Sequence, residues 1–316
     1  MNARNVIRIV LGAAGAAILG FGALSCSDQP RVRCAAARGN FAATYRLVSG
    51  SGPCAGLKGD ILAVQTYNPA NADRTPNWDQ ASMAIQPQAM TSLVQTGSGA
   101  MVTDPNAEDL PYALGSFSTS QPGADDFCTV PTLSVARIRL PEIAACMDGM
   151  TPTGQPATDV TYTWSNVRVY VTAAANGTEL AASLKVEQDG CTAEYAVEGL
   201  YPAISCLVPP PMAPPPDMPP PNPCADAGAG SADADDAGTD GSAGDDAMAV
   251  TASDAAATEP EAQAPMLPML DETLCSAEAD PAHGRPLGSG ISPDVVTRCD
   301  PDLQLCVLAK APPALK

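Results

Sequence analysis

Hydrophobic and polar residues alternate most regularly between residues 159 and 206. From Leu180 to Val186, every second residue is apolar, and the residues between them are polar or small. The segment Cys191–Val197 repeats this pattern. A period of two is typical of a strand with one face on a core and one face in water. Two neighbouring strands are therefore predicted here.

A third run, Val160–Thr172, comes before these two and changes face near Ser165-Asn166. A β-bulge at that point would reconcile its two halves. The pairs Asn176-Gly177 and Asp189-Gly190 separate the three runs, and such pairs supply the positive φ angles of tight hairpin turns. The pattern predicts a three-stranded antiparallel meander.

Shorter apolar runs precede the meander, at Phe41–Leu47, Ile61–Tyr67, Met83–Ile85 and Leu133–Leu140. Long segments rich in Pro, Asn, Asp and Gly separate them, at 68–80 and 95–126, and we find no sustained helical period. We therefore expect a mainly β fold, an antiparallel β-barrel or sandwich with long loops.

The N-terminus has the pattern of a secretory signal. Arg4 and Arg8 precede an apolar run, Ile9–Leu24, that is rich in Ala and Gly. This run is shorter than the roughly 17–25 residues that a membrane-spanning helix needs. We therefore expect a signal peptide over residues 1–25 and an extracytoplasmic protein.

The signal ends in Ala23-Leu24-Ser25-Cys26, which resembles the lipobox of bacterial lipoproteins. The resemblance implies a diacylglyceryl group on Cys26, cleavage just before it and acylation of the new amine, as by palmitate. Ala23 stands where Leu is usual, and ordinary signal-peptide cleavage before Cys26 is the alternative. Ser27, rather than Asp, is compatible by the same resemblance with sorting to an outer membrane. The implied protein is a lipoprotein anchored in the membrane of the cell envelope.

The cysteine count fits this interpretation, because lipidation of Cys26 leaves an even number of thiols to pair in an oxidising envelope. The remaining ten are Cys34, Cys54, Cys128, Cys146, Cys191, Cys206, Cys224, Cys275, Cys299 and Cys306. Nearest-neighbour pairing in the domain would join Cys34 to Cys54, Cys128 to Cys146 and Cys191 to Cys206. A bond between Cys206 and Cys224 is the alternative for the last of these.

Two composition shifts coincide near Cys206. All aromatic residues after the signal lie between Phe41 and Tyr201, and no Lys or Arg occurs between Lys185 and Arg285. After the signal peptide, the predicted organisation is a lipid-anchored N-terminus and short tether, a β-rich domain, a disordered Pro-rich and then Asp/Ala/Gly-rich linker, and a small Cys-stapled tail that the linker carries outward. These parts cover residues 26–40, 41–206, 207–270 and 271–316.

Charge and composition exclude several kinds of chemistry. The formal net charge of −19 makes nucleic acid a poor partner, because phosphate binding needs clustered Lys and Arg. The single histidine, His283, lies in a tail loop, which leaves little for a catalytic triad or a zinc site. We expect no catalytic residue, no metal and no cofactor.

The sequence therefore favours a cell-envelope lipoprotein with a structural or protein-interaction role. Its partners would be the membrane, through the N-terminal lipid, and envelope proteins. The main alternative is a lipocalin-like carrier of a small molecule, with a pocket lined by Tyr162, Trp164 and Tyr195; these three side chains could equally form core. A third possibility, an envelope hydrolase, requires two carboxylates that converge in a cleft.

Overall fold

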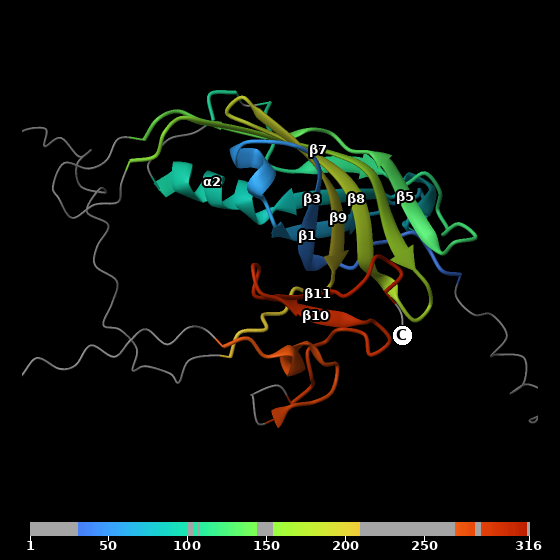
Figure 1. Cartoon of the computed structure of the whole chain (residues 1–316). Helices are drawn as coiled ribbons and strands as arrows, with labels where there is room; N and C mark the ends of the chain where they lie inside the picture. Colours follow the sequence, from blue (N-terminus) through green and yellow to red (C-terminus); the bar gives the residue numbers. More distant parts are fainter. Residues whose placement is uncertain are drawn as a thin grey trace, which may run out of the picture.

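The computed structural model describes residues 31–99, 104–106, 108–143, 154–208, 269–281 and 286–314. Its main body is a nine-stranded antiparallel sheet in the order β4-β3-β2-β1-β9-β8-β7-β5, with β6 also pairing with β7 (Figure 1). The strands are β1 (Gly39–Gly50), β2 (Gly59–Tyr67), β3 (Ser82–Pro87), β4 (Ala113–Ser116), β5 (Phe127–Thr132), β6 (Ala136–Leu140), β7 (Thr158–Val171), β8 (Asn176–Gln188) and β9 (Cys191–Leu200). The expected mainly β, antiparallel fold is confirmed.

The sheet curls until its two outermost strands, β4 and β5, approach each other. The backbone N–H of Ser118 donates to the carbonyl of Thr129 at 2.8 Å, and that of Ser134 donates to Leu114 at 2.7 Å. A Cβ on Gly115 of β4 would lie 2.6 Å from the carbonyl oxygen of Thr132. The sheet is therefore a nearly closed barrel rather than a sandwich.

The predicted meander is present as β7, β8 and β9. The pairing of β7 with β8 shifts register between Ser165 and Arg168, and Asn166 has a φ of 51°, which confirms the bulge. Asp189 and Gly190 both have positive φ in the β8–β9 turn. Asn176-Gly177, in contrast, begins β8, and the chain reverses through residues 172–175.

The structure contains a helix that the pattern did not predict, α2 (Gln88–Gly99). Its N-terminus is capped from β2, because Oδ2 of Asp60 accepts the backbone N–H of Ala89 at 3.1 Å. Met90 is fully buried and Leu93 packs against the core, so its apolar face is too short to produce a sustained helical period. The helix and the short 3-10 turn η1 (Pro53–Gly56) lie at the barrel end that holds the β8–β9 turn, hereafter the turn end.

Residues 31–38, hereafter the strap, cross the opposite end of the barrel. Cys34 forms a disulfide with Cys128 at the start of β5. The N–H of Ala36 donates to Oγ1 of Thr66 at 2.8 Å, and that of Ala37 donates to Gly177 at 2.9 Å. The part of the predicted 26–40 tether that the structure describes is thus built into the fold.

The tail packs against the outer face of the barrel, below the sheet in Figure 1. It contains the 3-10 turn η3 (Glu272–Cys275) and a hairpin of β10 (Thr297–Asp300) and β11 (Leu305–Leu308). Its apolar side chains form one buried cluster with Leu200, and the N–H of Cys306 donates to Ile204 at 2.8 Å. The expectation that a linker carries the tail outward is wrong, because this apolar surface is buried against the sheet.

The structure describes four disulfides, and they contradict the nearest-neighbour pairing. They join Cys34 to Cys128, Cys54 to Cys191, Cys206 to Cys299 and Cys275 to Cys306. The pairing was wrong because β1 lies beside β9, which brings residues far apart in sequence together. Cys146 and Cys224 lie outside the described residues.

Candidate functional site

The outer face of the sheet carries a row of polar side chains at the turn end. Antiparallel register places Arg137 of β6 opposite Thr161 of β7, Thr161 opposite Glu187 of β8, and Glu187 opposite Thr192 of β9. These residues alternate with core residues along each strand, so they share the outer face. Pairing alone thus aligns four polar side chains from four strands.

This row lines an open pocket of about 450 Å³. The β8–β9 turn and Asp159 of β7 complete its wall. The lining residues are Arg137, Asp159, Thr161, Glu187, Gln188, Asp189, Gly190, Cys191 and Thr192. The disulfide between Cys191 and Cys54 fixes the start of β9 to η1, so one wall of the pocket is held covalently.

Ion pairs hold the charged groups of the pocket. The guanidinium of Arg137 donates to both carboxylate oxygens of Asp159, at 3.0 and 2.6 Å. This bidentate hydrogen bond raises the pKa of Arg137 above its ordinary value. Lys185 pairs with Glu187 at 2.9 Å, and Oδ1 of Asp189 accepts the backbone N–H of Asp159 at 2.9 Å.

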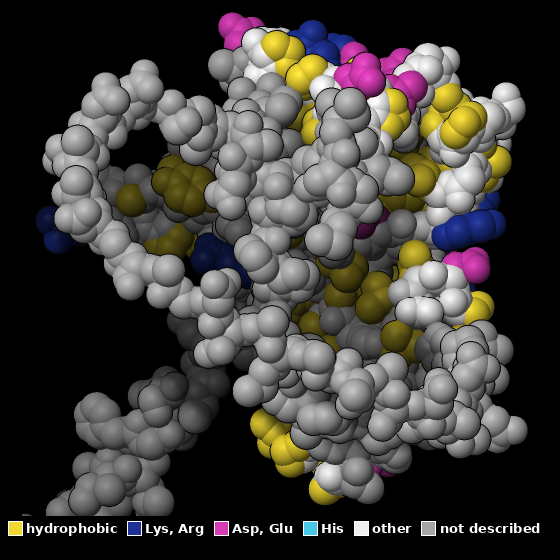
Figure 2. All heavy atoms as spheres, turned by 90° about the vertical axis from the view of Figure 1, so that its left-hand side faces the viewer, with side chains coloured by type: hydrophobic (Ala, Val, Ile, Leu, Met, Phe, Trp, Pro, Cys, Tyr) yellow, Lys and Arg dark blue, Asp and Glu magenta, His cyan; other side chains and the backbone are white. Residues whose placement is uncertain are grey.

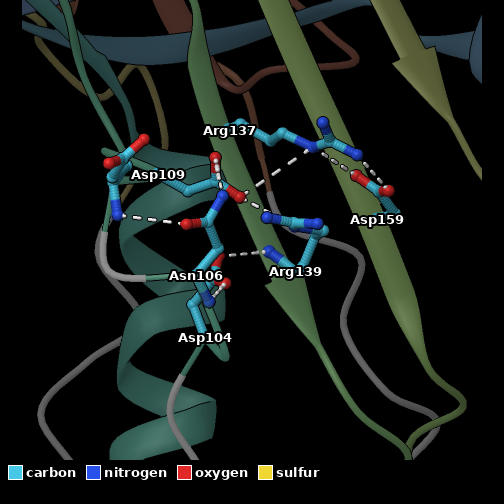
Figure 3. A network of polar contacts seen from close by, with 7 residues as sticks. Asp104, Asn106, Asp109, Arg137, Arg139 and Asp159 are labelled. Atoms are coloured by element: carbon cyan, nitrogen blue, oxygen red, sulfur yellow. Dashed lines mark hydrogen bonds and ion pairs between the residues drawn. The ribbon is translucent and has the colours of Figure 1, made fainter.

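A second layer of polar contacts supports Arg137 from the loop before β4 (Figure 3). Asp109 accepts Nε of Arg139 at 2.8 Å and lies 4.0 Å from Nε of Arg137. Asp104 accepts the backbone N–H of Arg139 at 2.7 Å, and Nδ2 of Asn106 donates to Asp109 at 3.3 Å. The loop and β6 are therefore tied together behind the pocket.

Acidic and basic side chains gather at the upper edge of the face drawn in Figure 2, which looks onto the turn end. The pocket nevertheless offers mostly acceptors, because it combines Asp159, Glu187 and Asp189 with one guanidinium that is already paired. Such a lining suits a partner that presents ammonium, guanidinium or hydroxyl groups.

Tyr162, Trp164 and Tyr195, the predicted pocket residues, point into the barrel. Their exposed fractions are 3%, 0% and 1%, and all three belong to the main core cluster. The rings of Tyr162 and Trp164 lie 6.5 Å apart, and that of Tyr195 lies 5.7 Å from Tyr45. The structure thus brings them together in the core, and none of them lines the outer pocket.

The polar atoms of this aromatic cluster differ in their contacts. The hydroxyl of Tyr195 donates to the carbonyl of Cys54 and accepts the N–H of Leu57 at 3.2 Å. Among the described residues, the hydroxyl of Tyr45 and Nε1 of Trp164 are buried without a hydrogen-bond partner. Burial, followed by the charge of Asp60, raises the pKa of Tyr45 well above its ordinary value.

Asp60 lies beside the aromatic cluster and was not a predicted site residue. Burial raises the pKa of its carboxyl to about 6, against the opposing effect of backbone hydrogen bonds from Ala89, Ile61 and Gln88. Sequence reasoning also missed Arg137 and Asp159. The alternation of Arg137 and Arg139 with apolar residues in β6 was the signal that could have placed cations on an outer face.

Two further residues singled out from the sequence are Cys26, the expected lipidation site, and His283, expected to lie in a tail loop without a catalytic role. Cys26 and His283 lie outside the described residues. The sulfur atoms of Cys206, Cys275 and Cys306 lie within 4.8 Å of one another, but each is in a disulfide and so cannot serve as a thiolate ligand. Within the described ranges, no helix is long and apolar enough to cross a membrane.

Comparison with known proteins finds a protein family whose model matches the barrel. A family model described as MlpA matches residues 39–202, just over half of the chain. A Myxococcus xanthus protein, which its name describes as a candidate lipoprotein, MlpA, is 27% identical over 131 residues. That match covers 42% of this chain and 49% of the relative, so it spans about half the relative's length. No solved structure matches the chain.

Proposed function

The chain belongs to the MlpA family, and from this premise we propose that it is a lipid-anchored envelope protein that binds other envelope components through its outer pocket. The relative described as a candidate lipoprotein supports the anchor, and Cys26 is its attachment point. Acyl chains contribute ~0.8 kcal/mol per buried CH₂, so two or three chains hold a protein stably on a membrane.

The observation that carries the binding role is the contrast between the two faces of the sheet. The inner face is packed with core side chains, whereas the outer face presents the pocket formed by Arg137, Asp159, Glu187 and Thr192. A disulfide and a bidentate ion pair preorganise this pocket. Preorganisation lowers the entropic cost of binding, which favours recognition of a partner.

The pocket supports binding better than catalysis. A hydrolase that uses two carboxylates needs one protonated acid and one ionised base. Here Asp159 is engaged by a bidentate ion pair with Arg137, and Glu187 pairs with Lys185, so both carboxylates already have partners. We therefore propose a non-enzymatic role, with a polypeptide partner that presents basic or hydroxyl side chains.

Site-specific photo-crosslinking in cells tests the binding role. A crosslinker at Thr192, on the pocket rim, should give a discrete adduct, and the charge reversal Asp189→Lys should abolish it. A crosslinker at Gln65, which is exposed on β2 away from the pocket, is the matched control. Equal adducts from both positions, or an adduct that survives Asp189→Lys, would contradict the proposal.

The anchor is tested separately by the intact mass of the mature protein from membranes. The expected species begins at Cys26, carries added acyl mass and has no free thiol before reduction. An unmodified soluble chain with one reactive thiol would contradict anchoring and leave the pocket proposal untouched.

A small-molecule carrier is the second candidate, and one observation favours it. The buried Nε1 of Trp164 and hydroxyl of Tyr45 lack hydrogen-bond partners among the described residues, and polar atoms of a bound molecule could supply partners for them. Native mass spectrometry of the purified protein should then show a mass above that of the polypeptide, and Trp164→Phe should reduce its occupancy. A bare polypeptide mass would remove this candidate.

A further inference from the structure

Several arginines gather at the strap end of the barrel. Arg31 and Arg38 of the strap are exposed and Arg33 is half-buried. Arg74, also exposed, follows β2, which ends at this end of the barrel. Among the described residues, Arg31, Arg33 and Arg74 form no ion pair with a carboxylate. Within the part of the chain that the structure describes, their charges are therefore available to an external anion.

The fold holds the strap arginines in place. The disulfide between Cys34 and Cys128 fixes the chain one residue after Arg33. Nη2 of Arg38 donates to the carbonyl of Thr66 at 2.8 Å, which anchors the other side of the strap. The positive charges thus belong to a defined surface rather than to a free tether.

The position of Cys26 brings this surface close to a membrane. Seven residues, 27–33, separate Cys26 from the disulfide-bonded Cys34. A fully extended chain spans at most ~3.3–3.6 Å per residue, so a lipid on Cys26 keeps the strap end within roughly 28 Å of the bilayer. This step rests on the anchor of the proposed function.

The charge of the barrel is distributed unevenly between its ends. The turn end carries the carboxylates of Asp104, Asp109 and Asp189 around its pocket. At the strap end, Asp125 is paired with Arg168 at 2.7 Å, and the exposed Asp73 and Asp126 are fewer than the arginines Arg31, Arg33, Arg38 and Arg74. Tyr67 is also 66% exposed there, and tyrosine is favoured at membrane interfaces.

We propose that the strap end binds the anionic phospholipid surface of the membrane that holds the anchor. Arginine forms strong charge-assisted hydrogen bonds with phosphate oxygens, and each basic side chain near an anionic leaflet strengthens binding roughly fivefold. Docking by this end turns the acidic turn end, with its pocket, toward partners away from the membrane. The lipid therefore tethers the protein, and the arginines orient it.

The test uses the full mature chain with Cys26→Ser, so that no acyl group contributes. Its sedimentation is measured with vesicles of phosphatidylglycerol and phosphatidylcholine, and with phosphatidylcholine alone. We expect binding to the anionic vesicles that falls as salt increases. The variant R31Q/R33Q should lower the partition coefficient roughly 25-fold, from two fivefold contributions.

The matched control, R46Q/K58Q, removes the same charge from two exposed positions outside the strap and should lower binding less than twofold. Equal losses in the two variants, or no preference for anionic vesicles, would overturn the proposal. Displacement by glycerol phosphate at constant ionic strength would also overturn it, because that result indicates a site for one phosphate. The unacylated protein keeps this outcome distinct from the mass measurement on Cys26.

Discussion

The backbone N–H of Ala314 donates to Oε2 of Glu179 at 2.7 Å, across 135 residues of chain. Glu179 lies on the outer face of β8 and is fully buried, because the tail covers it. Its other oxygen, Oε1, has no hydrogen-bond partner among the described residues. The tail therefore docks over a carboxyl group that is satisfied at one oxygen.

This burial predicts that tail docking weakens as pH rises. Burial raises the pKa of Glu179 above its ordinary 4.5, although Ala314 and Lys310 oppose the shift. A raised pKa means that the stabilisation is complete below pH 4.5 and is lost as Glu179 ionises. Hydrogen exchange at the Ala314 amide, corrected for its intrinsic rate, should show less protection at pH 8 than at pH 4.

The variant Glu179→Gln is the control for this prediction, because Gln keeps an acceptor for Ala314 but cannot ionise. Protection of the Ala314 amide should then be independent of pH. If the wild-type protein and the variant lose protection in parallel, another group controls docking.

Removing the Cys206–Cys299 disulfide should release the tail from the barrel. This bond closes 93 residues and joins the end of the domain to β10, so its loss should cost roughly 2–5 kcal/mol. In C206S/C299S, we expect rapid exchange at the Cys306 amide, which donates to Ile204, with β8 and β9 still protected. C275S/C306S, which lies within the tail, is the comparison. Simultaneous loss of protection in β8 and β9 would show that barrel and tail unfold as one unit.

The sequence predicted elements whose pattern is local. Over Leu180–Val186 of β8 and Cys191–Val197 of β9, one face lies on the core and the other is exposed or half-buried, so the alternation is regular there. Helix α2 escaped prediction because its apolar residues on the core are few, chiefly Met90 and Leu93. The position of the tail and the disulfide pairing depend on which strands are neighbours. The hydrophobic pattern of a single segment does not determine that order.

The residues of the candidate site were likewise predicted only where they depend on local pattern. Sequence reasoning grouped Tyr162, Trp164 and Tyr195, because all three lie within the predicted meander. It did not connect Arg137 with Asp159, since that pair requires the register of β6 against β7. Asp60 was missed because its environment comes from α2, which had no recognised pattern.

Closure of the barrel predicts that Gly115→Ala is destabilising. A Cβ at this position would lie 2.6 Å from the Thr132 carbonyl oxygen and 2.6 Å from Cγ1 of Val130, so β4 and β5 would have to separate. Overpacking of this kind costs roughly 1–3 kcal/mol. Gly56→Ala is the control, because nothing lies within 4 Å of its added Cβ. Equal denaturant midpoints for the two variants would show that β4 and β5 are not in contact in solution.

The raised pKa of Asp60, at the opposite end of the barrel from the strap, predicts a second pH dependence, that of the free energy of unfolding. Its pKa is raised from 3.8 to about 6, chiefly by burial, so its contribution to stability is complete below pH 4 and declines as pH rises through 6. After a discount for its partial exposure, we expect the loss to be roughly 1–2 kcal/mol. Urea unfolding of the wild-type protein and of Asp60→Asn between pH 4 and pH 8 measures it. The two curves of unfolding free energy against pH should lie closest at low pH, where both side chains are neutral, and separate as pH rises, because the variant lacks the decline. Parallel curves would mean that the Asp60 carboxyl is solvated, and that α2 does not seal the turn end.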